Sequence, residues 1–348
     1  VGTGPLKFIE RVEGVHVRYE AIDDHWRISP DYKELEFRWV PESATRMAAL
    51  LAEEVHLSDI ERAARAEALA RGMTIIPSST SGMQVRTFFG GQYYTQPELL
   101  DQSNPLLDIK VRQAMNKAID RQTIVDTLLV GSTVLMPHIF PFHPQLDEDL
   151  WPGVFNQDWL DRYDEMYGYD PERAKELLDE AGYPNGFEFT IYLAPLSGLP
   201  EIPDIGQAMA LDFESIGLKP KLVNLEFSKI KAKYKGQKMS NEMYVVRGGN
   251  STLTYMSLYY PTKSSGHAYH TEELDALWDE LGQTLDRKNR TRILREMGNT
   301  TYNEFSSILM FALSTEILAN PKFVAEYKFP GDTSGFFTHL EQIKTVPQ

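Results

Sequence analysis

The chain has 348 residues, of which 42% are hydrophobic and 11% aromatic, so it can bury a large core and is long enough for two domains. It carries 50 acidic and 35 basic residues, a formal net charge of −15, and this balance disfavours nucleic acid and anionic membranes as partners. The absence of cysteine excludes disulfides and thiolate chemistry, and no apolar run is long enough to span a bilayer.

The first predicted elements are a strand and three helices. Residues 35–40 alternate as in a half-buried strand, and Ser43 is expected to cap a helix that ends near Val55. Asp108 is expected to cap a second helix, and Asp120 begins a shorter helix. Residues 132–169 are rich in proline, aromatics and acids, and we expect a long irregular connection there.

The clearest helix begins after Asp170. This aspartate can accept hydrogen bonds from the free amides of the first turn, and Pro171 suits the first helical position. Apolar residues recur at i, i+3, i+4 and i+7 between Ala174 and Ala181, and Gly182 is a typical left-handed terminator.

Helices and strands alternate after this point. Residues 187–193 and 219–225 are predicted strands, with a predicted helix over 205–216 between them. Two further helices are expected over 272–286 and 288–305. This order predicts an α/β fold with neighbouring strands in one sheet.

No motif proposes a reaction mechanism. His267 and His270, and separately His138 and His143, are close enough in sequence to suggest a metal site, but without cysteine or helical spacing we expect ordinary packing roles. The lysine-rich run at 229–238 is expected to be a solvated helix face rather than an anion-binding patch.

Several ordered segments resemble one protein family. They are GTGPLKFIERVEGVHVRYEAIDDHWR, ELEFRWVPESATRMAALLAEEV, NPLLDIKVRQAMNKAIDRQTIV, YDPERAKELLDEAGYPNGFEFTI, LDFESIGLKPKL and YHTEELDALWDE. The third and fourth are closest to the patterns of the extracellular solute-binding proteins of family 5, the peptide and nickel type, which serve ABC importers. The resemblance covers essentially the whole chain and is closest to the carboxy-terminal part of a family member.

The resemblance implies an α/β, two-lobe periplasmic-binding-protein fold of type II, peptide-binding-like. Residues 1–103 and 309–348 are expected to form the first lobe, and 104–308 the second. The amino-terminal part of the first lobe is expected to be missing, so that another segment completes it. Family members close on a ligand between the lobes by hinge motion.

The function implied is capture of a small solute or peptide for an ABC permease in the membrane, in the periplasm or elsewhere outside the cytoplasm. We expect no enzymatic activity, no cofactor, no resident metal, no nucleic-acid partner, and a monomer when the fold is complete. Two alternatives stay open: a hydrolase on a two-lobe α/β scaffold, and a truncated interaction module.

The expected ligand site is the stretch VVRGGNSTLTYMSLYY at 245–260, because ligands of open α/β sheets lie beyond the carboxyl ends of strands. Peptide-binding relatives carry an aspartate here that anchors an ammonium group, whereas this chain has Arg247-Gly248-Gly249.

An arginine suits a carboxylate or phosphate, so we expect Arg247 to meet an anionic group. The expected polar contacts are Asn250, Ser251 and Thr252, and the expected apolar walls are Tyr255, Tyr93 and Phe88. A structural salt bridge for the arginine and core packing for the aromatics are the alternatives.

Overall fold

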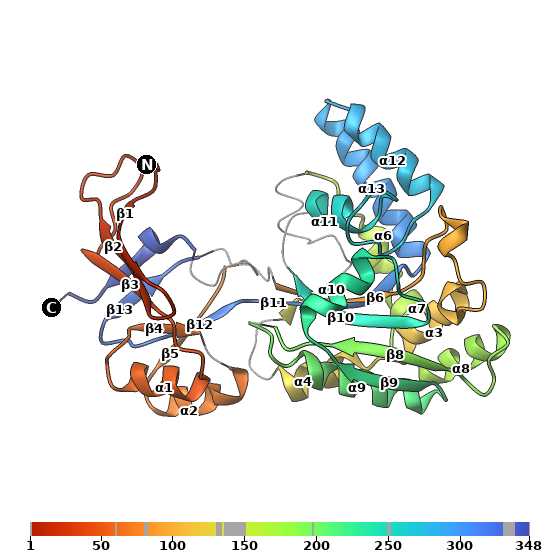
Figure 1. The fold of residues 1–348 in the computed structure, drawn as a ribbon, viewed down its shortest axis with the longest axis horizontal. Helices are drawn as coiled ribbons and strands as arrows, with labels where there is room; N and C mark the ends of the chain where they lie inside the picture. The colour runs from red at the N-terminus through yellow and green to blue at the C-terminus, as the bar shows by residue number, and fades with distance from the viewer. Residues whose placement is uncertain are drawn as a thin grey trace. The chain divides into compact units, whose positions relative to one another are not determined.

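The chain divides into two compact units. The computed structural model describes residues 2–59, 61–79, 83–129, 134–135, 151–196, 198–248, 252–329 and 338–347. One unit comprises Val1–Gly82 and Ser314–Gln348, and the other Met83–Leu313 (Figure 1). Residues 83–103 and 309–313 thus belong to the second unit, in contrast to the boundaries expected from the sequence, because they contain strands of its sheet.

The second unit is built on a six-stranded mixed sheet of order β7-β11-β6-β10-β8-β9. Its strands are β6 (Met83–Phe89), β7 (Val134–Leu135), β8 (Glu188–Leu193), β9 (Lys219–Asn224), β10 (Glu242–Gly248) and β11 (Ser307–Leu313). β8, β9 and β10 are parallel, whereas β6 is antiparallel to both β10 and β11. The sheet is therefore wound from helix–strand units and closed by antiparallel strands.

Helices cover both faces of this sheet (Figure 1). They are α3 (Ile109–Ala118), α4 (Arg121–Leu128), α6 (Gln157–Asp161), α7 (Tyr163–Tyr167), α8 (Pro171–Glu180), α9 (Ile202–Ser215), α10 (Phe227–Lys235), α11 (Thr252–Tyr259), α12 (Glu272–Gln283) and α13 (Arg287–Asn303), with short 3-10 turns at Pro97–Leu99 and Pro105–Leu107. One apolar core joins α3, α4, α8 and α9 to one face, and a second joins α10, α11 and α13 to the other.

The predicted caps form as expected at three helices. The carboxylates of Asp108, Asp120 and Asp170 accept hydrogen bonds from backbone amides of the first helical turn at 2.8, 3.0 and 2.9 Å. Gly182, after α8, has a φ of +86°, the left-handed conformation that favours glycine. These short-range signals fix where each helix begins or ends.

Two details of the sequence prediction are wrong. The residue before α1 is Glu42, so Ser43 is the first helical residue and not the cap. The connection at 132–169 is not irregular throughout, because α6 and α7 form in its described part, where Asn156 caps α6 and Trp159 and Tyr167 are buried. Tertiary burial stabilises helices that are too short to show a periodic pattern.

The first unit is smaller and contains three sheets. Their strands are β1 (Leu6–Val12), β2 (His16–Ala21) and β3 (Glu34–Arg38) in one antiparallel sheet, β4 (Leu57–Asp59), β12 (Glu316–Ala319) and β5 (Thr74–Pro77) in the second, and β13 (Val324–Tyr327) with β14 (Ile343–Thr345) in the third. Its described residues also form two helices, α1 (Ser43–Leu51) and α2 (Arg65–Ala70), and 3-10 turns at Arg62–Ala64 and Leu340–Gln342. No helix in the described ranges is long and apolar enough to cross a membrane.

Candidate functional site

The carboxyl edge of the six-stranded sheet gathers several strand ends. β8, β9 and β10 are parallel and end there at Leu193, Asn224 and Gly248. Since β6 is antiparallel to β10 and β11, the start of β6 and the end of β11 lie at the same edge. This is the edge at which open α/β sheets bind ligands.

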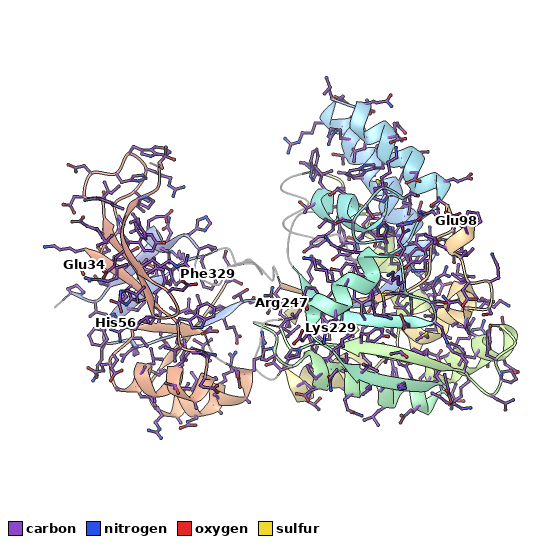
Figure 2. The ribbon with its side chains drawn as sticks, in the orientation of Figure 1. Glu34, His56, Glu98, Lys229, Arg247 and Phe329 are labelled. Carbon is purple, nitrogen blue, oxygen red and sulfur yellow. The ribbon has the colours of Figure 1, made fainter. Side chains whose placement is uncertain are left out.

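Arg247 is the predicted anion-binding residue, and it lies on β10 one residue before the strand ends (Figure 2). It is half-buried and pairs in register with Val85 of β6. α11 begins at Thr252, shortly after β10 ends, so its amino terminus follows Arg247 closely in the chain.

The other predicted contacts separate into three groups. Asn250 and Ser251 lie outside the described residues. Thr252 and Tyr255 are buried in α11, close in the chain to Arg247. Phe88 and Tyr93 are also buried, but they lie toward the opposite edge, because Phe88 pairs with Tyr244 near the start of β10 and Tyr93 follows the end of β6.

The structure therefore does not bring Phe88 and Tyr93 to Arg247. Arg247 lies three residues after Tyr244, about 10 Å along β10. The ring of Phe88 stacks on that of Tyr259 at 4.7 Å, and the ring of Tyr93 lies 5.8 Å from that of His270. These are core contacts, and a role of either residue as a ligand wall stays a prediction.

Sequence reasoning missed Arg86, a buried arginine near the same edge. Its guanidinium carbon lies 3.4 Å from the ring centre of Tyr255, and its Nε and Nη2 donate to Oε1 of Gln84 at 3.2 and 2.9 Å. Burial raises the pKa of Tyr259, while Arg86 opposes that rise as a charge and as a hydrogen-bond donor. The sequence signal that could have identified Arg86 is its position as the single charged residue of the strand MQVRTFF.

Gly248 leaves the space that Arg86 occupies. A Cβ atom built on Gly248 would lie 2.1 Å from Nη1 and 2.2 Å from Cζ of Arg86, far closer than non-bonded atoms approach. Val246 and Gly248 of β10 lie on the same face of the sheet as Arg86 of β6. The glycine after Arg247 thus allows a second cation to pack against the last residue of β10.

Two other buried arginines have structural roles. Arg112 donates to the main-chain carbonyls of Glu304, Leu106 and Leu107 at 2.8–3.2 Å. Arg121 donates to carbonyls of α3, α7 and β11. Arg112 thus ties α3 to the end of α13 and to the 3-10 turn before α3, and Arg121 ties α4 to the sheet; backbone oxygens satisfy both cations, as burial requires.

The histidines His267 and His270 lie side by side, with Nδ1 of the first 3.3 Å from Nε2 of the second. Burial, with a smaller effect of His267, lowers the pKa of His270 to about 4, so its imidazole is neutral at pH 7. No group of three or more His, Cys, Asp or Glu side chains suited to a metal occurs in the described part of the chain. His138 and His143 lie outside it.

The lysine-rich run at 229–238 lies largely on α10. Lys229 is exposed (Figure 2), and Nζ of Lys233 pairs with Glu242 at 3.2 Å. The run contributes a solvated face and one ion pair.

Comparisons with known proteins agree on one family. A family model described as "Bacterial extracellular solute-binding proteins, family 5 Middle" matches residues 1–270. Heme-binding protein A of Haemophilus influenzae is 24% identical over 311 residues, 87% of this chain and 53% of its own length. The dipeptide-binding protein of Escherichia coli is 27% identical over 229 residues, 65% of this chain and 39% of its own length.

A solved structure matches nearly all of the chain. The ABC transporter substrate binding protein CtaP of Listeria monocytogenes superposes with a TM-score of 0.80 at 20% identity, over 99% of this chain and 67% of its own. The chain spans about half, or less, of the length of the two curated relatives above.

Proposed function

The chain belongs to the bacterial extracellular solute-binding proteins of family 5, and from that premise we propose that it captures a solute outside the cytoplasm for the permease of an ABC importer. The expected fold class is confirmed, because the α/β architecture matches that of a solved substrate-binding protein over 99% of the chain. The relatives are binding proteins and not enzymes, which supports binding without turnover and gives no support to the hydrolase alternative.

The ligand is proposed to carry an anionic group. The single observation that carries this proposal is the position of Arg247 at the carboxyl edge, just before the strand end and the amino terminus of α11. A guanidinium can hold a carboxylate or phosphate through two parallel hydrogen bonds. Dipeptides and heme, the ligands in the names of the two curated relatives, both carry carboxylates.

Arg86 supports the same site from the other face of the sheet. Its guanidinium is fixed by the ring of Tyr255 and by Gln84, so it adds positive potential near the end of β10 with little freedom to move. A fixed cation in a poorly solvated place favours a negative ligand group more than a mobile surface lysine does. In this proposal Arg247 contacts the ligand and Arg86 acts through the electrostatic field.

The finer expectations belong to the same proposal. They are closure of two lobes on the ligand, a periplasmic location and a monomeric state when the fold is complete. The family's description as extracellular supports the location, whereas lobe closure and the monomeric state rest on the resemblance alone.

Native mass spectrometry of the protein as purified tests the proposal. We expect a bound species that disappears after partial unfolding and refolding, and that contains a carboxylate or phosphate by fragmentation. A bound species without any anionic group would overturn the anionic part of the proposal and leave solute binding intact. Turnover of that species by the protein would instead favour an enzyme.

A further inference from the structure

A hollow of about 400 Å³ lies in the second unit, bordered by α11, α12 and α13 (Figure 1). Leu253 and Ser257 line it from α11. Each lies two residues from Tyr255, and a helix turns about 100° per residue, so both are on the side of α11 opposite to Tyr255. Since Tyr255 packs on Arg86, the hollow lies on the other face of α11 from the contacts near the candidate site.

The walls of this hollow are mainly apolar. Leu253 and Trp278 are half-buried, and both pack against the core that joins α10, α11 and α13 to the sheet, which fixes their positions beside the hollow. Nothing lies within 4 Å of a Cβ atom built on Gly282, so the hollow is open along the main chain of α12 there. Small-molecule sites measure about 300–1,000 Å³, so this one has room for a single small ligand.

Arg290 is the one charged residue that lines the hollow among the residues that the structure describes. Its Nη1 donates to the carbonyls of Leu281 and Thr284, at 2.7 and 2.9 Å, and so caps the carboxyl end of α12. The ring of Trp151 lies 5.5 Å from its Cζ. Within the described ranges, Nε and Nη2 make no hydrogen bond, and no carboxylate pairs with this guanidinium. Arg290 is therefore a fixed, half-buried cation with two adjacent donors unused.

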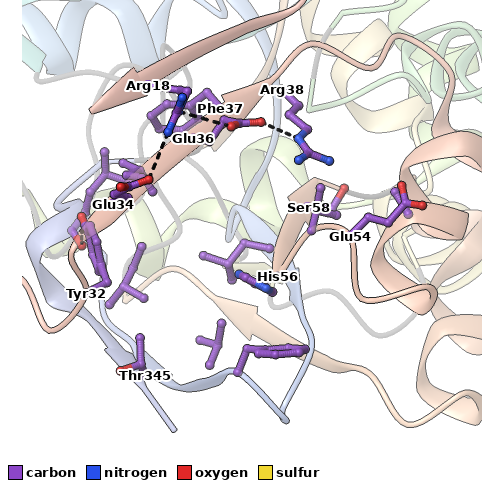
Figure 3. A pocket seen from close by; sticks show the side chains of 18 of the residues that line it. Arg18, Tyr32, Glu34, Glu36, Phe37, Arg38, Glu54, His56, Ser58 and Thr345 are labelled. Atoms are coloured by element: carbon purple, nitrogen blue, oxygen red, sulfur yellow. Dashed lines mark hydrogen bonds and ion pairs between the residues drawn. The ribbon is translucent and has the colours of Figure 1, made fainter. Parts of the chain in front are cut away.

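A larger hollow, of about 830 Å³ in the first unit, differs in that its arginines are matched (Figure 3). The ion pairs are Arg18 with Glu34 at 3.2 Å, Arg38 with Glu36 at 2.6 Å, and Arg46 with Asp59 at 2.9 Å. A ligand carboxylate would have to displace one of these partners. The hollow at Arg290 is therefore the better place for an anion.

We propose that the hollow at Arg290 is a second ligand site, and that it takes a small carboxylate with an apolar, ring-sized body. Nε and Nη2 of Arg290 donate two parallel hydrogen bonds to the carboxylate, and the body lies against Trp278 and Leu253. No acidic side chain of the described part of the chain lines the hollow, so an ammonium group would have no charged partner there. This favours a simple carboxylate over a free amino acid or a peptide. The proposal is independent of the ligand at Arg247, and either can fail alone.

Fluorine NMR of the protein labelled with 5-fluorotryptophan tests this proposal, with 4-phenylbutyrate as the probe. The resonance of Trp278 is identified as the one that disappears in Trp278→Phe. We expect this resonance to shift on saturable binding, with a dissociation constant below about 1 mM. The neutral 4-phenylbutyramide should bind about tenfold or more weakly, because it cannot form the charged pair. The proposal is overturned if this resonance does not shift, or if the amide binds as tightly as the carboxylate.

Two variants change the hollow itself. Arg290→Lys keeps the positive charge but lacks the planar pair of donors, and Gly282→Phe adds a ring at the open stretch of α12. We expect each to weaken binding of the probe about tenfold or more. Gly282→Phe leaves the capping bonds of Arg290 in place, so it tests the site even where Arg290→Lys destabilises the hairpin of α12 and α13. The proposal is contradicted if Gly282→Phe binds the probe as tightly as the unsubstituted protein.

Two controls separate this site from its surroundings. Gln283→Phe adds the same ring at the next, exposed residue of α12, and Arg247→Ala alters the candidate site. Both should change the affinity for the probe less than about twofold. Loss of the Trp278 shift in Arg247→Ala would assign the probe to the candidate site and overturn the proposal of a second one.

Discussion

Replacing Gly248 with alanine tests how firmly Arg86 is held at the end of β10. The added methyl group would lie within 2.1–2.4 Å of three guanidinium atoms, so the guanidinium must leave its place over Tyr255 and beside Gln84. A cation–π contact contributes about 0.5–2 kcal/mol and a hydrogen bond from a charged group about 1.5–3 kcal/mol. Because these terms overlap, we expect the free energy of unfolding of the second unit to fall by about 2–4 kcal/mol.

Urea denaturation followed by tryptophan fluorescence measures this loss, since Trp151, Trp159 and Trp278 report on the second unit. The two units can unfold in separate transitions, so each is fitted by itself. Gly282→Ala in α12 is the matched control: nothing lies within 4 Å of its added Cβ, and we expect a gain of up to about 1 kcal/mol.

The double variant Arg86→Met with Gly248→Ala completes the test. Removing the guanidinium should relieve the clash. Gly248→Ala should therefore lower the free energy of unfolding much less in the Arg86→Met protein than in the unsubstituted protein. Neutral surface substitutions change the free energy of unfolding by less than about 0.5 kcal/mol. The account of Arg86 is refuted if the Gly248→Ala variant differs from the unsubstituted protein by no more than that.

Two further predictions concern stability. Asp170→Ala should lower the free energy of unfolding by about 1 kcal/mol, because it removes the cap on α8. The control Asp179→Ala, within the same helix, should change this free energy by less than about half as much. Urea denaturation of both variants compares them. The pKa of His270 in the folded protein, about 4, lies below its ordinary value of 6.5. The stability that its neutral imidazole contributes is therefore present above pH 6.5 and is lost as the pH falls toward 4. Between pH 7 and 5 the unsubstituted protein should therefore lose about 2 kcal/mol more than His270→Gln, and an equal loss in both would rule out this histidine as the cause.

Short-range signals in the sequence were sufficient for three helices of the second unit. An aspartate before each helix and an apolar period predicted α3, α4 and α8, and Gly182 marked the end of α8, because capping bonds and amphipathic stripes depend on residues within one or two turns. α6 and α7 have five residues each and were missed, since burial of Trp159 and Tyr167 stabilises them and burial depends on distant parts of the chain.

The candidate site was only partly predictable. The strand end at Arg247 was recognised because an apolar run precedes the arginine and two glycines follow it. The direction of a strand and its register with neighbours are set by the whole sheet, so sequence could not show that Phe88 and Tyr93 lie toward the other edge or that Arg86 packs on Gly248. The residues 249–251, which include two predicted contacts, lie outside the described ranges.

The most direct test of the central claim is the affinity of the protein for its co-purified ligand, measured by calorimetry with Arg247→Ala and with Lys229→Ala. Both variants lose one positive charge from the second unit, but Lys229 is an exposed residue of α10. A charged hydrogen bond lost at the site corresponds to about 1.5–3 kcal/mol, so Arg247→Ala should weaken binding roughly 10- to 150-fold, while Lys229→Ala should change it less than about twofold. Equal affinities for the two variants would contradict the account.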